Sequence, residues 1–236
     1  SYSDVNYGVM RGLVALGLFQ SQDEINRSPK QTYGEVRPGD IRYKDVNADG
    51  KIDDDDVVPI AHSNVPQIQY GFALEYRYKR WTISALFTGA AKVNFLYGGS
   101  GFYPFSGGEV GNILSIVNDP KNRWTPAWYS GDPSTENPNA RFPRLTYGEN
   151  KNNNRASTFW LADGSYLRWK SLDISYRIGT NKALRTVGIS DMNLQFVGQN
   201  LAVWDSVKLW DPGQASKNGA VYPLQRTFSL QLTATF

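Results

Sequence analysis

The sequence contains no cysteine and a single histidine, His62. The absence of cysteine excludes disulfides, zinc–thiolate sites and cysteine nucleophiles. One histidine cannot form a two-histidine metal site and disfavours a serine–histidine catalytic pair, so we interpret His62 as a loop residue. The sequence also lacks a Gly-x-Ser-x-Gly elbow and a Gly-x-Gly-x-x-Gly turn before a helix, so we expect no enzyme.

Long apolar runs and a strong net charge are missing as well. The best apolar stretch, residues 9–19, is too short to cross a membrane as a helix and is interrupted by Arg11. The 25 basic and 22 acidic residues leave a net charge of +3, too small to indicate binding to nucleic acid or to an anionic lipid surface. The sequence begins at Ser1 without a methionine or a signal peptide, so we take the chain as mature, processed or cut from something longer.

Aromatic residues and glycine are plentiful, and they suit strands and turns. In residues 227–236 every even position is apolar and every odd position is polar. Side chains of a strand point alternately to opposite faces, so this segment has one apolar and one polar face. Similar alternation, or a strand-rich composition in the first segment, predicts six strands in all. They are expected at residues 2–19, 66–78, 81–92, 163–178, 191–204 and 223–236.

The connections between these strands are very unequal in length. The turn at Lys79-Arg80 and the connection around residues 179–190 are short. Long loops, expected to be extracellular, follow the first, third and fifth strands at about residues 20–65, 93–162 and 205–222. This asymmetry predicts an all-β, antiparallel transmembrane barrel of the outer-membrane type, with a polar face lining an aqueous lumen and an apolar face meeting lipid. Aromatic residues near strand ends would lie in the membrane interface: Tyr76, Tyr78, Trp81, Trp204 and Phe236.

Six strands are too few to close a barrel around a lumen, since single-chain barrels begin at about eight strands. The chain is therefore expected to be a piece of a bigger wall, completed by another polypeptide or by an upstream part. A soluble β-sandwich would produce the same alternation and stays an alternative, although it explains the one-sided loop lengths and the aromatic last residue less well.

An acidic segment, residues 45–56, follows the pattern of a twelve-residue calcium loop. Gly50 takes the sixth place, where the sharp turn needs glycine, and Ile52 takes the eighth place as an apolar anchor. We predict bound Ca2+ in a structural role because six aspartates and one lysine leave the segment with a charge of −5. A solvated acidic turn held by Asx hydrogen bonds is the alternative. The predicted metal ligands are the side chains of Asp45, Asn47, Asp49, Asp53 and Asp56 and the backbone carbonyl of Lys51.

Two features separate this segment from a paired calcium sensor. Asp56 stands where a longer glutamate is usual, which lowers the expected affinity. Residues 41–44 look extended, and Pro59 blocks a long following helix. We therefore expect a lone calcium loop that stiffens a longer loop.

A series of motifs, taken in order along nearly the whole chain, carries a family resemblance. They are residues 17–21 (Gly-Leu-Phe-Gln-Ser), 38–45 (Pro-Gly-Asp-Ile-Arg-Tyr-Lys-Asp), 58–60, 123–126 (Arg-Trp-Thr-Pro), 141–145, 157–168, 198–201, 210–212 and 222–227, followed by the terminal alternating strand. With these motifs the sequence resembles the carboxy-terminal part of SusC/RagA-family TonB-dependent outer-membrane transporters of Bacteroidota.

The resemblance implies a barrel of about 22 strands in the outer membrane, with a plug inside it and a SusD-type surface lipoprotein over it as a lid. Such pairs import oligosaccharides or peptides, driven by the proton-motive force through TonB. The plug and the TonB-contacting segment would lie upstream, and this chain would be the last six strands. The terminal strand, ending at Phe236, would also be the recognition signal for the barrel-insertion machinery. The implied partners are the upstream portion, the lid, TonB, a glycan or peptide substrate and outer-membrane lipid, with no nucleic acid.

Aromatic residues are also frequent in the predicted loops, where they would stack on sugars, anchor the lid or pack the loops against one another. Packing is favoured for any single residue, so we name no substrate-binding residue. The loop aromatics are Phe102, Tyr103, Phe105, Trp124, Trp128, Tyr129, Trp160 and Trp210.

We interpret the basic residues Arg141, Arg144 and Arg168 as members of loop salt bridges. The alternative function for the whole chain is a soluble, calcium-bearing β-sandwich that binds carbohydrate.

Overall fold

A computed structural model of the chain describes residues 8–99, 101–105 and 113–236. The chain divides into two compact units. The loop unit comprises residues 1–65, 94–162 and 214–221, and the sheet unit comprises residues 66–93, 163–213 and 222–236. In the described part of the chain, no helix is both long and apolar enough to cross a membrane.

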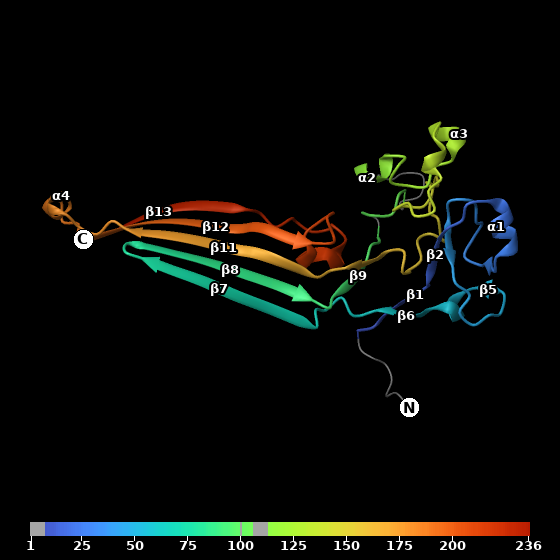
Figure 1. Cartoon of the computed structure of the whole chain (residues 1–236), viewed down its shortest axis with the longest axis horizontal. Helices are drawn as coiled ribbons and strands as arrows, with labels where there is room; N and C mark the ends of the chain where they lie inside the picture. Colours follow the sequence, from blue (N-terminus) through green and yellow to red (C-terminus); the bar gives the residue numbers. More distant parts are fainter. Residues whose placement is uncertain (1–7, 100, 106–112) are drawn as a thin grey trace, which may run out of the picture. The chain divides into compact units, whose positions relative to one another are not determined.

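The sheet unit is built on one five-stranded antiparallel sheet (Figure 1). Its strands follow one another in the order β13-β12-β11-β8-β7, so each strand pairs with the strand of this sheet that precedes or follows it in the sequence. A short helix, α4 (Lys182–Thr186), lies in the connection between β11 and β12. The strands are β7 (Ile68–Tyr78), β8 (Trp81–Ala91), β11 (Tyr166–Arg177), β12 (Asp191–Asp205) and β13 (Thr227–Thr235).

These strands confirm five of the six segments predicted from alternation, with ends that differ by a few residues. Pro223 cannot donate a ladder hydrogen bond, and β13 begins four residues after it, at Thr227. Lys79 and Arg80 form the tight turn of the β7–β8 hairpin, with Tyr78 paired to Trp81 and Lys79 at φ 54°. An eleven-residue strand such as β7 is about 37 Å long, enough to cross an apolar band of about 25 Å when tilted.

The apolar face of the sheet is open to the surroundings. Phe72 is 46% exposed, Leu232 60% and Leu230 72%. A β-sandwich would bury these side chains between two layers. Their exposure contradicts that alternative and is the arrangement expected of a membrane wall.

The predicted first strand, residues 2–19, is wrong as a single strand of this sheet. Its described part forms two short strands in the loop unit, β1 (Met10–Gly12) and β2 (Ala15–Leu18), while residues 2–7 lie outside the described residues. The physical reason is that apolar side chains here do not alternate: Leu13, Leu18 and Phe19 are all buried. The two strands pair with β6 (Val58–Ala61) and β4 (Ile41–Tyr43), respectively.

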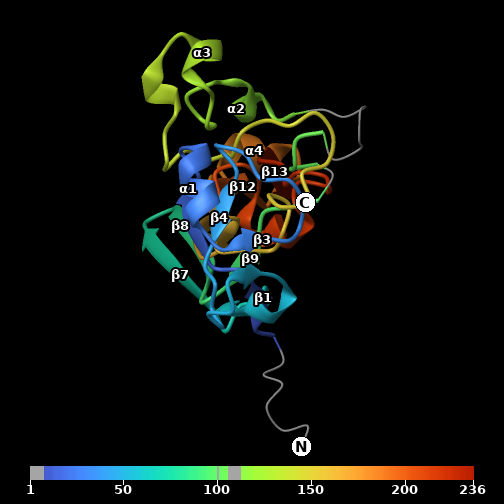
Figure 2. The same cartoon turned by 90° about the vertical axis from the view of Figure 1, so that its right-hand side faces the viewer.

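The other elements of the loop unit are short. Strands β3 (Lys30–Gln31) and β5 (Lys51–Ile52) pair in parallel, and β9 (Asn94–Leu96) pairs with β10 (Leu161–Asp163), whose last residue belongs to the sheet unit. Helices α2 and α3 lie near each other in both views (Figures 1 and 2). The helices are α1 (Gln22–Arg27), α2 (Ser115–Asn118) and α3 (Ala127–Ser130), with 3-10 turns at η1 (Asp54–Asp56), η2 (Pro133–Thr135) and η3 (Pro212–Lys217), the last of which spans the division between the units.

An aromatic cluster forms much of the core of the loop unit. Phe102, which is 2% exposed, stacks on Tyr97 with ring centroids 4.8 Å apart and meets Trp160 edge-on at 5.4 Å. Phe142 lies 5.8 Å from Phe102. The predicted long loop at residues 93–162 therefore folds around an aromatic core of its own instead of standing as an open loop.

One glycine in the sheet unit is required by a close contact. A side-chain carbon added to Gly89 would lie 2.4 Å from the Tyr70 ring and 2.5 Å from the Tyr166 carbonyl oxygen. The Tyr70 hydroxyl donates a 2.9 Å hydrogen bond to that same oxygen. The ring of Tyr70 is thus laid across Gly89 and tied to the neighbouring strand β11.

We expect Gly89→Ala to lower the free energy of unfolding by about 1–3 kcal/mol, because the methyl group must displace the Tyr70 ring or the backbone of β11. Gly71→Ala is the matched control in the same sheet, since its added carbon meets nothing nearer than 3.4 Å. Urea unfolding of the full-length protein measures both. An equal effect of the two substitutions would contradict the close-contact explanation.

Candidate functional site

The acidic segment 45–56 folds as one tight turn. The two carboxylate oxygens of Asp45 accept hydrogen bonds from the backbone N–H groups of Ala48 at 2.7 Å and Gly50 at 2.9 Å. At the other end, Asp56 is fully buried and accepts from the N–H groups of Val46 at 2.6 Å and Asp53 at 3.0 Å. The first and last predicted ligands thus both hold the backbone of the turn.

Cationic side chains already lie beside several of these carboxylates. Lys51 contacts Asp53 and lies 3.5 Å from Asp49, and its ammonium group lowers the pKa of the Asp53 carboxyl. Asp54 contacts Arg155 and accepts a 3.1 Å hydrogen bond from the Tyr33 hydroxyl. Burial and this hydrogen bond raise the pKa of Tyr33 to about 12. Part of the charge of the segment is therefore balanced within the loop unit.

Two local features expected of the segment are observed. Ile52 is 1% exposed and serves as the apolar anchor, and residues 41–43 are extended in β4. Within the described ranges, no group of three histidine, cysteine, aspartate or glutamate side chains is gathered as for a metal ion. Asn47, Asp49 and Asp53 each accept a hydrogen bond from the backbone N–H two residues further on, at 3.1, 3.1 and 3.0 Å, as in an Asx-stabilised turn. Calcium binding stays a prediction.

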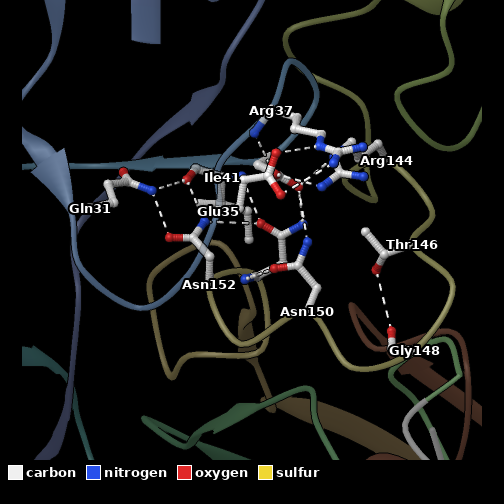
Figure 3. Close-up of polar contacts among 11 residues, drawn as sticks. Gln31, Glu35, Arg37, Ile41, Arg144, Thr146, Gly148, Asn150 and Asn152 are labelled. Carbon is white, nitrogen blue, oxygen red and sulfur yellow. Dashed lines mark hydrogen bonds and ion pairs between the residues drawn. The ribbon is translucent and has the colours of Figure 1, made fainter. Parts of the chain in front are cut away.

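A buried polar network lies next to this turn and was not singled out from the sequence (Figure 3). At its centre Asp40 is fully buried and forms an ion pair with Arg144, with Nε to Oδ1 at 2.9 Å and Nη2 to Oδ2 at 3.0 Å. Asn150 and Asn153 donate side-chain hydrogen bonds to Asp40 at 3.0 and 2.8 Å. A buried carboxylate needs such partners, because an unpaired buried charge is costly.

The network continues through amide side chains to the strand before the acidic segment. Gln31 donates to the Ile41 carbonyl oxygen at 2.9 Å and to Asn152 at 2.7 Å (Figure 3). The Tyr43 hydroxyl donates to the Asn152 carbonyl oxygen at 2.8 Å, and burial raises its pKa. The amide-rich run at residues 150–154 was the available sequence signal. Its role is to hold residues 40–43 against residues 144–153.

An aromatic groove of about 660 Å³ opens beside this network in the loop unit. Trp124 is buried and packs over Gly39, whose added side-chain carbon would lie 2.3 Å from the indole ring. Trp128 and Tyr129, by contrast, are 84% and 66% exposed. The groove is lined by Gln20, Arg37, Pro38, Arg123, Trp124, Thr125, Pro126, Trp128, Tyr129, Glu136, Arg144 and Leu145.

The polar side chains of the groove are largely occupied by internal bonds. Arg123 donates to the carbonyl oxygens of Val117 and Asn118, both at 2.7 Å, at the end of α2. Glu136 accepts from the Ala127 N–H at 2.7 Å, and Gln20 accepts from the Trp124 indole at 3.3 Å. What the groove offers to a partner is mainly aromatic and proline surface.

The predicted loop aromatics therefore divide into three groups. Phe102, Trp124 and Trp160 are buried, which confirms loop packing for them, whereas Trp128 and Tyr129 are exposed. The other three, Tyr103, Phe105 and Trp210, are half-buried.

The three predicted salt-bridge arginines also differ. Arg144 pairs with Asp40, as described, and Arg168 pairs with Asp211 through contacts of 2.7 and 2.6 Å in the sheet unit. Both confirm the prediction. Arg141 lies over the Phe142 ring at 5.7 Å, and none of the ion pairs among the described residues includes it. His62 is an exposed residue between β6 and β7, as predicted.

Comparison with known proteins gives sequence relatives that are much longer than this chain. No family model matches it. It is 28% identical over 240 residues to the TonB-dependent receptor P26 of Formosa agariphila, covering 97% of this chain and 22% of that protein. It is 24% identical over 217 residues to the TonB-dependent receptor P3 of the same organism, covering 86% and 20%. The chain thus spans about a fifth of the length of these relatives.

Solved structures share the fold. A chain of the RagAB peptide transporter superimposes with a TM-score of 0.65 at 16% identity, over 97% of this chain and 22% of that chain. The RagAB peptide importer in its "open-open" state gives 0.63 at 17% identity, over 100% and 24%. These findings confirm the resemblance to SusC/RagA-type TonB-dependent transporters and the assignment of the fold to a segment of their β-barrel chain.

Proposed function

We propose that this chain forms part of the barrel wall of a TonB-dependent importer in the outer membrane. The observation that carries the proposal is the apolar face of the sheet unit, where Leu74 is 61% exposed on β7 and Leu230 is 72% exposed on β13, the two outermost strands of the same sheet. An apolar surface of this kind is unfavourable in water, whereas lipid would cover it. The names of the sequence relatives, TonB-dependent receptors, support the same function.

The two outer strands of the sheet support a wall that continues beyond this chain. Strands β7 and β13 each have one edge without a partner strand among the described residues. Unpaired backbone groups are costly in hydrocarbon, so these edges require further strands. The rest of the protein would supply them, together with the plug and the segment that contacts TonB.

The substrate would be an oligosaccharide or a peptide, taken up together with a SusD-type lipoprotein lid. The structural neighbours are a peptide transporter and a peptide importer, which supports a peptide substrate, whereas the family resemblance includes both classes. The polar face of the strands, with Gln195 and Gln231 paired across β12 and β13, would line the aqueous lumen.

The aromatic groove is the surface that we assign to the lid. Its exposed residues Trp128 and Tyr129 meet edge-on with centroids 5.9 Å apart. Exposed tryptophan and tyrosine beside a groove are typical anchors of protein interfaces. Sugar hydroxyls need free hydrogen-bonding groups, and the groove's Arg123, Glu136 and Gln20 are already bonded internally. This favours a protein partner over a sugar.

Calcium in the acidic turn is a further part of the proposal. The spacing of Asp45, Asn47 and Asp49 and the buried anchor Ile52 support it. When bound, the ion would balance the carboxylates that now share Lys51. The role of the ion would be structural, because the turn is tied into the loop unit by the contacts of Asp54 with Arg155 and Tyr33.

The membrane proposal can be tested by measuring which face of the sheet is accessible to water. The chain has no native cysteine, so single cysteines placed in it are unambiguous probes. In the full-length protein in bilayers, Gln231→Cys should react rapidly with a water-soluble maleimide, because it faces the lumen. Leu230→Cys, its neighbour, should react far more slowly, because a thiol in hydrocarbon stays protonated. Rapid labelling of both, or the reverse order, would contradict the membrane wall.

We expect Trp128→Ala to weaken binding of the lipoprotein lid by at least about 2 kcal/mol, roughly thirtyfold in Kd, because the anchor is lost. Tyr147→Ala is the matched control, as Tyr147 is 76% exposed in the same unit and does not line the groove. Surface plasmon resonance with the purified lid measures both. Unchanged lid binding with reduced substrate uptake would instead make the groove a substrate site.

Calorimetric titration of the full-length protein with Ca2+ should show binding below millimolar concentration, and Asp45→Ala should abolish it because the first ligand is lost. Asp54→Ala is the control, since this residue is not among the six predicted ligands and retains the spacing of the turn. Absence of heat at millimolar Ca2+ would leave the segment as an Asx-stabilised turn.

A further inference from the structure

Basic residues gather at the short-turn end of the sheet unit. Lys79 and Arg80 form the β7–β8 turn, and Lys182 and Arg185 lie on α4 in the β11–β12 connection. The two connections are at the same end, because the Arg177 N–H donates to the Arg80 carbonyl oxygen at 2.9 Å (Figure 1). All four side chains are exposed. We call Lys79, Arg80, Lys182 and Arg185 the basic rim.

The rim has positive charge that the sheet unit does not balance. Residues 75–80 and 177–191 contain six cations and two carboxylates, a surplus of four charges that exceeds the +3 of the whole chain. Both carboxylates are already paired with cations outside the rim, Glu75 with Arg77 and Asp191 with Arg177.

The rim residues have other neighbours of their own. Lys79 lies 5.1 Å from the centre of the Tyr78 ring, and Arg80 donates to the Ile178 carbonyl oxygen at 2.9 Å. Within the described residues, none of the ion pairs includes a rim residue. The four cations are therefore available to an anionic partner.

Aromatic residues form a belt directly beside the rim. Tyr76 is 63% exposed, Tyr78 53% and Trp81 45%, and the Trp81 ring lies 4.6 Å from Tyr176. Tyr76 and Tyr78 continue the same face as Leu74 along β7. Along the strand the order is thus apolar, aromatic and then basic, which matches hydrocarbon, interface and phosphate layers of a bilayer.

We propose that the basic rim binds the phosphate groups of anionic phospholipids in the leaflet around the short-turn end of the sheet. The inference rests on the proposed function as a membrane wall. The rim is continuous with the exposed apolar face, so its cations would meet headgroups wherever that face meets acyl chains. Lysine and arginine reach such groups by extending their long side chains to the interface. The small net charge of the chain conceals this local surplus.

Lipid competition in nanodiscs tests the inference with the full-length protein. Nanodiscs contain phosphatidylcholine alone or mixed with phosphatidylglycerol, and native mass spectrometry counts the lipids that stay bound. We expect the protein to retain phosphatidylglycerol preferentially. Lys182→Gln together with Arg185→Gln should lower that preference on the order of thirtyfold, because the variant loses two cations and each cation near an anionic surface contributes about 1 kcal/mol.

The control removes the same charge elsewhere. Lys30→Gln with Lys151→Gln takes two exposed cations from the loop unit and should leave the preference unchanged. Lys182→Arg with Arg185→Lys should retain it. Provided that the protein inserts into the nanodisc, two results would overturn the inference: an equal loss of the phosphatidylglycerol preference in both glutamine variants, or no loss of it in the rim variant. Failure of the unaltered protein to enter nanodiscs would count against the membrane wall itself.

Discussion

The solvation of one face of a single-layer sheet is the constraint on which the rest of this structure depends. The large apolar and aromatic side chains at every second position of β7 and β13 are exposed, and the sheet unit does not cover them with a second layer. Such a surface is stable only where the medium is itself apolar. The length of the strands, the aromatic belt and the position of the charged turns are all consistent with that medium being a bilayer.

Much of the sheet unit could be predicted from the sequence because a period of two is a strong local signal. Five strands, their antiparallel order and the tight turn at Lys79-Arg80 followed from it. The segment at residues 2–19 could not be predicted this way, since its apolar residues are buried from several directions by partners distant in the chain, such as β4 and β6. Strand composition alone does not distinguish a wall strand from a short strand in a folded loop.

The loop unit was predictable mainly where local spacing decides the structure. The turn at residues 45–56, with Gly50 and Ile52 in their expected places, is such a case. A salt bridge at Arg144 was predicted, but its partner Asp40 and the amides around it were not, because this network joins residues more than a hundred positions apart. Nor could the sequence separate the buried Trp124 from the exposed Trp128 four residues later, since that difference depends on the packing of Gly39.

That packing links two parts of the loop unit mechanically. Gly39 adjoins Asp40, the centre of the buried network, and it supports the indole of Trp124, which forms one wall of the aromatic groove. Displacement of the backbone at residues 38–41 would tilt this indole and reshape the groove. Arg144 pairs with Asp40 in this same backbone and also lines the groove, so loss of the buried ion pair would alter the groove's width.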